Sequence, residues 1–146
     1  HWEDGDSTGF ANLKEIYTMS KFFNNPVVGI DVSADFSYAA ILAPNGDVYK
    51  KSFKIKHDVS GFNYLVNEIK KVEKEFNMKT AIFMESTGVY HLSLFHYLNN
   101  NFDNTFVINP LVTKCNKNVD IRKVKNDKKD ALSIANIGKF QNTYFS

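Results

Sequence analysis

The alternation of apolar and polar residues divides most of the chain into eight predicted elements. Val27–Val32 is a short apolar run of mostly β-branched residues, which is typical of a buried strand. Two further strand-like runs follow, Phe36–Ala43 and Val48–Ile55, and the turn-forming residues Pro44–Asp47 join them. These three runs predict an antiparallel meander.

Helical and strand patterns alternate in the second half of the chain. Asp58 or Ser60 can cap a helix whose apolar face is formed by Phe62, Leu65, Val66, Ile69 and Phe76. The later patterns predict a strand, a helix, a strand and a final helix, at Thr80–Met84, Tyr90–Leu98, Thr105–Ile108 and Asp127–Phe140. The order β-β-β-α-β-α-β-α predicts an α/β fold with a mixed sheet and helices on its faces.

Several carboxylates stand where the pattern predicts burial. Asp31 lies inside the first apolar strand, where an uncompensated charge costs several kcal/mol, so we expect a counter-ion, a metal or a hydrogen-bond network beside it. Glu85 directly follows the apolar end of another strand. Asp127 and Asp130 are three residues apart and share one face of the last helix, the face that also carries Ala131, Ile134 and Ala135. These acids are therefore predicted to point toward the sheet.

Four carboxylates could converge only if a cation offset their repulsion. Ligands that are all oxygen atoms favour Mg²⁺ or Mn²⁺ over zinc. Two such ions about 4 Å apart could activate a nucleophile and stabilise the leaving oxygen of a phosphodiester. The spacing leaves simpler roles open as well: Asp127 as a helix cap, Asp130 as a solvated charge, and Glu85 as an incidental strand end.

Composition narrows the class of protein. The 146 residues suit one domain, and 43% hydrophobic residues, with 13 Phe, exclude wholesale disorder. The single cysteine, Cys115, excludes an internal disulfide and a cysteine-built zinc site, and it fits a reducing compartment. No apolar run is long enough to predict a membrane span. The first residue is His1 rather than Met, so we expect a chain that was cut, tagged or excised from something longer.

The formal charge of +2 conceals a basic segment. Residues 114–130 carry seven basic and three acidic side chains, which gives +4 and leaves −2 for the rest of the chain. Such a segment favours a nucleic-acid partner, because cations hold the phosphate backbone, although an ordinary solvated loop has the same composition. The candidate nucleic-acid-binding residues are Lys114, Lys117, Arg122, Lys123, Lys125, Lys128 and Lys129.

Four short motifs occur in an order that resembles a known family. They are Gly29–Ser33, Glu85–Tyr90, Asn109–Pro110 and Lys125–Ala131, and together they look like the motifs of the DEDD transposases of the insertion-sequence-110 type. The resemblance extends from about Val27 to Phe140. Ser86 stands where the family usually has Ala, and Asn126 where it usually has Thr; neither is a proposed metal ligand.

The resemblance implies a ribonuclease H-like, RuvC-like fold over residues 26–142, after an N-terminal extension of residues 1–25. It implies that Asp31, Glu85, Asp127 and Asp130 are catalytic acids that bind two Mg²⁺ or Mn²⁺ ions. The implied activity is metal-dependent cleavage and transfer of DNA strands during transposition, by a homo-oligomer in the prokaryotic cytoplasm, at the nucleoid. The implied partners are the element ends, the target DNA and a structured guide RNA. The family's C-terminal domain, which carries a serine that attacks DNA, has no counterpart in this chain.

Two other functions are compatible with the same pattern. One is a non-catalytic module that binds nucleic acid or oligomerises and keeps the acids as remnants. The other is a fragment of an actin-like or sugar-kinase-like ATPase, since those proteins also begin with a Gly-Ile-Asp strand and a meander. Such ATPases need a second nucleotide-binding half, and their activity does not call for an acid pair like Asp127 and Asp130. Both points count against this alternative. The histidines His57, His91 and His96 are predicted to be structural or exposed.

Overall fold

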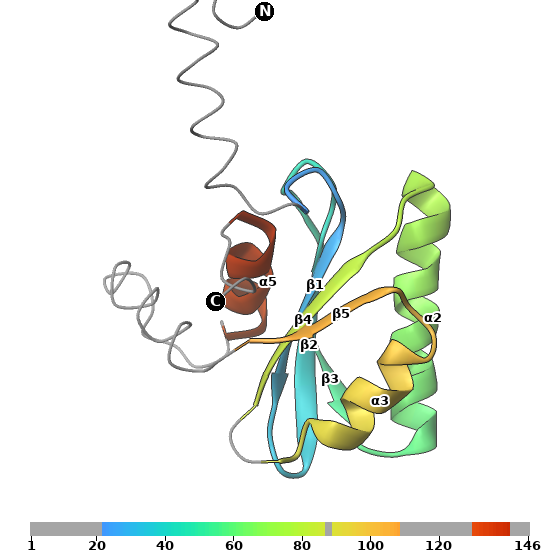
Figure 1. Ribbon diagram of the computed structural model, residues 1–146, viewed down its shortest axis with the longest axis vertical. Helices are drawn as coiled ribbons and strands as arrows, with labels where there is room; N and C mark the ends of the chain where they lie inside the picture. Colours follow the sequence, from blue (N-terminus) through green and yellow to red (C-terminus); the bar gives the residue numbers. More distant parts are fainter. Residues whose placement is uncertain (1–21, 87–88, 109–129, 141–146) are drawn as a thin grey trace, which may run out of the picture.

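A computed structural model describes residues 22–86, 89–108 and 130–140 (Figure 1). The strands are β1 (Val27–Val32), β2 (Phe36–Leu42), β3 (Val48–Lys56), β4 (Ala81–Ser86) and β5 (Asn104–Val107). The helices are α2 (Val59–Phe76), α3 (Leu92–Asn99) and α5 (Asp130–Phe140). The order of these elements along the chain confirms the predicted order. None of the described helices has the length and apolar character needed to cross a membrane.

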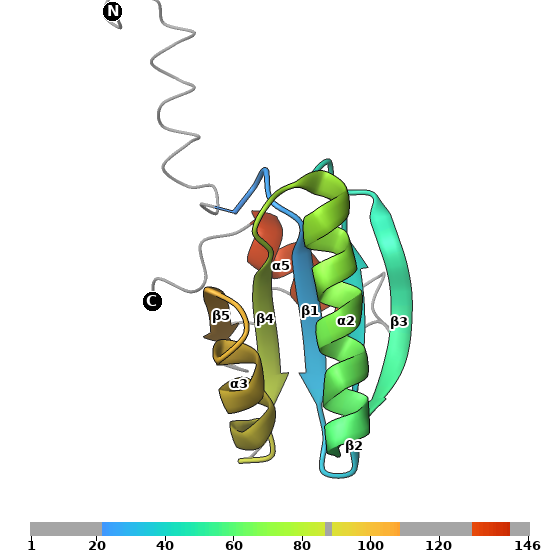
Figure 2. The same ribbon diagram turned by 90° about the vertical axis from the view of Figure 1, so that its right-hand side faces the viewer.

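The strands form one mixed sheet in the order β3-β2-β1-β4-β5. The first three strands are the predicted antiparallel meander, whereas β4 pairs in parallel with β1, and β5 with β4. Of the described helices, α2 and α3 cover one face of this sheet and α5 covers the other (Figures 1 and 2). The molecule is thus a layered α/β structure with a central sheet.

The larger hydrophobic core lies between the sheet and helices α2 and α3. Even-numbered residues of β1 and β4 point into it, because side chains alternate between the two faces of a strand. They meet the apolar face of α2, which was predicted from its helical spacing. Central members of this core are Val28, Ile30, Leu65, Ile69, Ile82 and Met84.

A second core lies between the sheet and α5. Val27 and Phe83 face Ile134 and Ala135 there. Phe22, which falls in the predicted N-terminal extension, is only 6% exposed and joins this core. Its ring lies 6.0 Å from that of Phe83 and 5.5 Å from that of Phe106. The segment just before β1 therefore packs on the sheet.

The backbone of α5 lies directly against β1 at Gly29. A Cβ atom at this position would lie 2.2 Å from the carbonyl oxygen of Ala131 and 2.3 Å from the nitrogen of Ala135. Only glycine allows this approach, because real Cβ contacts are never so short. The small side chains predicted on this face of the helix, Ala131 and Ala135, are fully covered by it.

The far end of α5 is held by a buried lysine. Lys139 is completely shielded from solvent, and its Nζ donates to the carbonyl oxygens of Phe23 (2.6 Å), Asn25 (2.7 Å) and Pro44 (2.8 Å). These carbonyls belong to the segment before β1 and to the turn after β2. Burial lowers the pKa of the Lys139 ammonium to about 8, so the group stays mainly charged at neutral pH. The lysine joins three chain segments at the start of β1.

Local hydrogen bonds accompany the first turns of α2 and α3. Of the two possible caps of α2, Asp58 is the one used, and its Oδ1 accepts from the Gly61 N–H at 2.7 Å. Helix α3 begins at Leu92 rather than at Tyr90, since no side chain caps it and the Leu92 N–H bonds to the Val89 carbonyl in a turn.

Substitution of Gly29 should loosen α5 from the sheet. We expect Gly29→Ala to lower the free energy of unfolding by about 3 kcal/mol, because an extra methyl group in a filled interface forces the helix backbone away. Urea denaturation measures this loss. The exposed α3 substitution Ser93→Ala is the control, with a change within about 0.5 kcal/mol. Equal unfolding curves for Gly29→Ala and wild type would contradict the close contact.

Lys139 should make stability depend on pH in a defined direction. Its pKa is lower in the folded protein, about 8, than the ordinary 10.5, so between these values the unfolded chain binds more protons. The stability that Lys139 contributes must then rise with pH over this range. We expect Lys139→Met to be destabilised at pH 7 by about 1 to 3 kcal/mol, because three carbonyls lose their donor. Its deficit relative to wild type, measured by urea denaturation, should grow from pH 8 to pH 10; a constant deficit would contradict this.

Candidate active site at the ends of strands β1 and β4

Asp31 and Glu85 lie side by side on neighbouring strands. The parallel register of β1 and β4 pairs these two residues, and adjacent strands are about 4.8 Å apart. Val27 of β1 and Phe83 of β4 belong to the core under α5, so by alternation Asp31 and Glu85 point to the same face. Both are half-buried. The structure thus brings together two of the four predicted acids.

Each acid is the penultimate residue of its strand. On the α5 side, β1 presents Val27, Gly29 and Asp31 in turn, and β4 ends in the same way with Phe83 and Glu85. Val27 and Phe83 pack in the core under α5, and the carboxylate follows two or more residues later in each strand. Different residues of each strand therefore provide the apolar packing and the carboxylate.

Helix α5 begins at the same end of the sheet. Its first turn, at Ala131, lies on Gly29, and its last turn, at Lys139, lies near the start of β1, so α5 runs opposite to β1. Gly29 precedes Asp31 by two residues, which is about 6.6 Å along a strand. The backbone of Asp130, the first residue of α5, accordingly lies toward the Asp31 end of β1. The side chain of Asp130 and the whole of Asp127 lie outside the described residues.

The two described acids fit a hard divalent cation by their chemistry. Carboxylate oxygens are the ligands that Mg²⁺ and Mn²⁺ prefer, and a cation offsets the repulsion of two neighbouring carboxylates. Within residues 22–86, 89–108 and 130–140, no group of three or more potential ligands comes together. The described part of the chain therefore supplies a pair of oxygen ligands.

The predicted basic segment lies outside the described residues. This applies to every candidate nucleic-acid-binding residue in it: Lys114, Lys117, Arg122, Lys123, Lys125, Lys128 and Lys129. It applies to Cys115 as well. Among the histidines, His57 Nε2 forms a 2.7 Å hydrogen bond with Ser37 Oγ, an interaction that joins β2 to the end of β3.

The register of the meander adds two residues that the sequence analysis missed. Asp31 pairs with Tyr38 of β2, and Tyr38 pairs with Lys54 of β3. Paired residues point to the same face, so Glu85, Asp31, Tyr38 and Lys54 form one row across four strands. The alternation of side chains along β2 and β3 indicates which residues of each strand share a face. That alternation does not give the register, because a bulge interrupts the pairing between Ala39 and Leu42.

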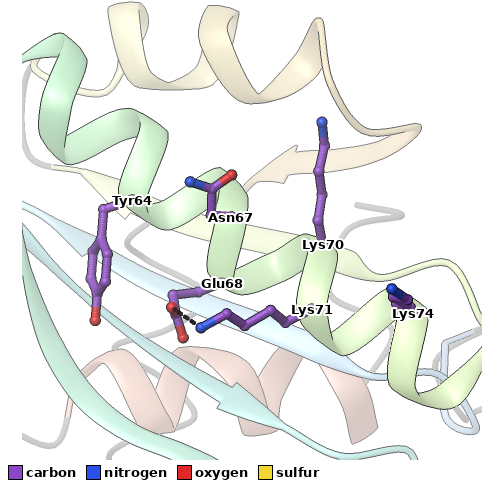
Figure 3. A pocket seen from close by; sticks show the side chains of 6 residues that line it. All are labelled: Tyr64, Asn67, Glu68, Lys70, Lys71 and Lys74. Carbon is purple, nitrogen blue, oxygen red and sulfur yellow. Dashed lines mark hydrogen bonds and ion pairs between the residues drawn. The ribbon is translucent and has the colours of Figure 1, made fainter.

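A shallow hollow on the opposite side of the molecule has different chemistry. It measures about 600 Å³ and is lined by Tyr64, Asn67, Glu68, Lys70, Lys71 and Lys74 of α2 (Figure 3). The Glu68 carboxylate forms salt bridges with Lys71 Nζ at 3.0 Å and with Lys50 Nζ at 3.4 Å. Burial alone would raise the pKa of Glu68, but these two lysines outweigh it and the net pKa is lowered. The hollow is thus partly neutralised by its own carboxylate and lies away from Asp31 and Glu85.

Comparison with solved structures identifies the fold. RuvC of Thermus thermophilus in complex with a Holliday junction substrate is 13% identical, with a TM-score of 0.50 over 80% of this chain and 98% of that one. A second Thermus thermophilus RuvC structure is 13% identical with a TM-score of 0.49 over the same shares. A ROK hexokinase from Thermus thermophilus is 15% identical, with a TM-score of 0.39 over 57% of this chain and 33% of that one. The fold is RuvC-like and ribonuclease H-like, as the resemblance implied.

Comparison with protein families gives a more specific result. No curated protein matches the chain. A family model described as a transposase, of the DEDD insertion-sequence-110 type, matches residues 28–145. The match contains all four predicted acids and every described strand except the first residue of β1. Since it covers most of the sequence, the chain belongs to the DEDD transposase family of the insertion-sequence-110 type.

Proposed function

We propose that this chain is a catalytic domain that cuts and transfers DNA strands with the help of divalent metal ions. The observation that carries the proposal is the pairing of Asp31 with Glu85 on one face of the sheet, with α5 beginning at the same end. Membership of a transposase family supports it. The RuvC structure of similar fold contains a Holliday junction substrate, which favours branched DNA for this chain too.

The metal ligands in this proposal are Asp31, Glu85, Asp127 and Asp130. Oxygen-only ligation selects Mg²⁺ or Mn²⁺, and four carboxylates can hold two ions. When bound, such ions polarise the scissile phosphate, activate the nucleophile and stabilise the leaving oxygen.

The protein's own residues contribute position. Asp31 and Glu85 stand on adjacent hydrogen-bonded strands, so their separation is fixed by the sheet rather than by a loop. Their half-buried side chains have restricted freedom, which lowers the entropic cost of holding a ligand in one geometry. The two acids would therefore hold the metal ions at a fixed separation, and the close packing at Gly29 holds the helix that begins with Asp130 near them.

The proposed partners and context extend beyond this chain. The basic residues between Lys114 and Lys129 would hold the phosphate backbone of the element ends and target DNA. A structured guide RNA would select the target, and several copies would act together in the prokaryotic cytoplasm, at the nucleoid. We assign residues 26–142 to the catalytic domain and residues 1–25 to an extension. Complete recombination would need the serine-bearing C-terminal domain of a longer protein.

Metal binding should require both described acids. In calorimetric titration of the chain with Mn²⁺, we expect Asp31→Asn and Glu85→Gln each to weaken binding by at least about tenfold, since each removes a charged ligand. Glu75→Gln, at an exposed site on α2 across the sheet, is the matched control and should leave binding unchanged. If Glu85→Gln bound Mn²⁺ as tightly as wild type, the metal site proposed at these strands would be wrong.

Strand cleavage should depend on the same acids. With a four-way branched DNA and Mg²⁺, we expect Asp31→Asn to cut at least about a hundredfold more slowly than wild type, because the ions supply several kcal/mol of charge stabilisation. EDTA should abolish cutting, and Glu75→Gln should cut normally. The non-catalytic alternative predicts the opposite: DNA binding without metal, unaffected by Asp31→Asn, and no cutting by the wild type.

A further inference from the structure

We infer that Phe36, Tyr38 and Lys54 form a binding surface for the DNA strand that is cut at Asp31 and Glu85. This inference rests on the proposed function and adds three residues outside the predicted basic segment. Phe36 and Tyr38 belong to β2, and Lys54 belongs to β3. All three lie on the face of the sheet that bears the acids.

The row across the sheet gives these residues a fixed position relative to the acids. Asp31, Tyr38 and Lys54 are paired in register on β1, β2 and β3. With strands about 4.8 Å apart, the Lys54 backbone lies about 10 Å from that of Asp31. A nucleic-acid strand carries one charge per about 3.4 Å of its axis, so this distance spans about three phosphates. A strand with one phosphate at the acids can place another phosphate, a few nucleotides away, at Lys54.

Lys54 is a cation that is ordered but not neutralised. Its side chain is exposed, and Nζ lies 4.1 Å from the centre of the Phe36 ring, a cation–π contact that limits its freedom. Within the described ranges, Lys54 forms no ion pair, whereas Lys50 on the same strand pairs with Glu68 at 3.4 Å. The ammonium of Lys54 therefore keeps its hydrogen-bond donors available for an anion.

The two aromatic rings beside Lys54 suit the apolar parts of a nucleotide. Phe36 and Tyr38 pack edge to face with their ring centres 5.4 Å apart, and both residues are half-buried. Aromatic rings next to a cation are the usual means of binding a nucleic-acid strand without reading its sequence. Lys56, paired with Phe36, adds a second exposed cation on this face.

Within residues 22–86, 89–108 and 130–140, α5 is the helix that covers this face of the sheet. On the face that bears the acids, α5 lies over the half nearer the start of β1, and no described helix lies over the half where β1 ends (Figure 1). The row of Asp31, Tyr38 and Lys54 falls in that second half. The other face is covered by α2 and α3 (Figure 2). Among the described helices, none blocks the path of a DNA strand from the acids along the sheet to β3.

The salt dependence of DNA binding tests this inference. Anisotropy titrations use a labelled four-way branched DNA, with Ca²⁺ in place of Mg²⁺ so that the DNA stays intact. We expect Lys54→Ala to make the slope of log K against log salt shallower by about 0.7 to 0.9, which corresponds to one lost phosphate contact. Lys54→Arg should restore the slope. Tyr38→Ala should weaken binding about fivefold or more, and Tyr38→Phe should not.

The control is Lys70→Ala, which removes the same charge from α2 on the opposite face. It should leave the slope unchanged. An unaltered slope for Lys54→Ala, an equal change for Lys70→Ala, or a change seen only with an RNA of the same sequence would overturn the inference. The proposed function is tested separately by metal binding and cutting in Asp31→Asn. If Asp31→Asn leaves metal binding and cutting unchanged but Lys54→Ala changes the slope, the proposed catalysis is wrong and the binding surface is supported. If Asp31→Asn has its expected effects but Lys54→Ala leaves the slope unchanged, the catalysis is supported and the binding surface is wrong.

Discussion

The contact of α5 with β1 at Gly29 is the constraint on which the site depends. A Cβ atom at this position would lie 2.2 Å from the Ala131 oxygen and 2.3 Å from the Ala135 nitrogen, well inside the ordinary contact distance of 3.4 to 4 Å. The absence of one Cβ therefore lets a helix lie directly on the strand that bears Asp31. Because the contact is made by backbone atoms, it fixes the distance between helix and sheet more tightly than interlocking side chains would.

The two ends of α5 are held by different means, and together they set its position along the sheet. Near its beginning the helix is held by its close backbone contact with Gly29. Near its end it is held by the hydrogen bonds of the Lys139 ammonium. Apolar packing alone is non-directional, so it does not fix the position of the helix along the strand. Hydrogen bonds to three carbonyls do fix it, because they require defined distances and angles. A helix fixed at both ends cannot slide by a residue. This holds the backbone of Asp130 at the Asp31 end of the strand.

The pattern of the sequence predicts local structure well and long-range pairing poorly. The limits of β1 follow from neighbouring residues, as does the placement of Asp31 within that strand. The local pattern leaves both Asp58 and Ser60 as candidates for the cap of α2, and the structure uses Asp58. The pairing of Tyr38 with Lys54 depends on a bulge between Ala39 and Leu42, which no local rule reveals. Lys139 was missed because a lysine in the last turn of a helix is ordinarily exposed. Its burial results from carbonyls over ninety residues away in sequence.

The two faces of the sheet have different roles: one provides most of the apolar core, and the other carries the candidate metal ligands. The face under α2 and α3 buries a continuous apolar core and provides stability. On the face under α5, the apolar residues of β1 and β4 pack against the helix, and the carboxylates Asp31 and Glu85 follow toward the ends of these strands. A β-sheet is well suited to this division, because the pleat lets one residue stabilise one face while the next carries chemistry on the other. Ile30 and Asp31 illustrate it: one strand supplies both the core and the candidate ligand, at a spacing set by the backbone.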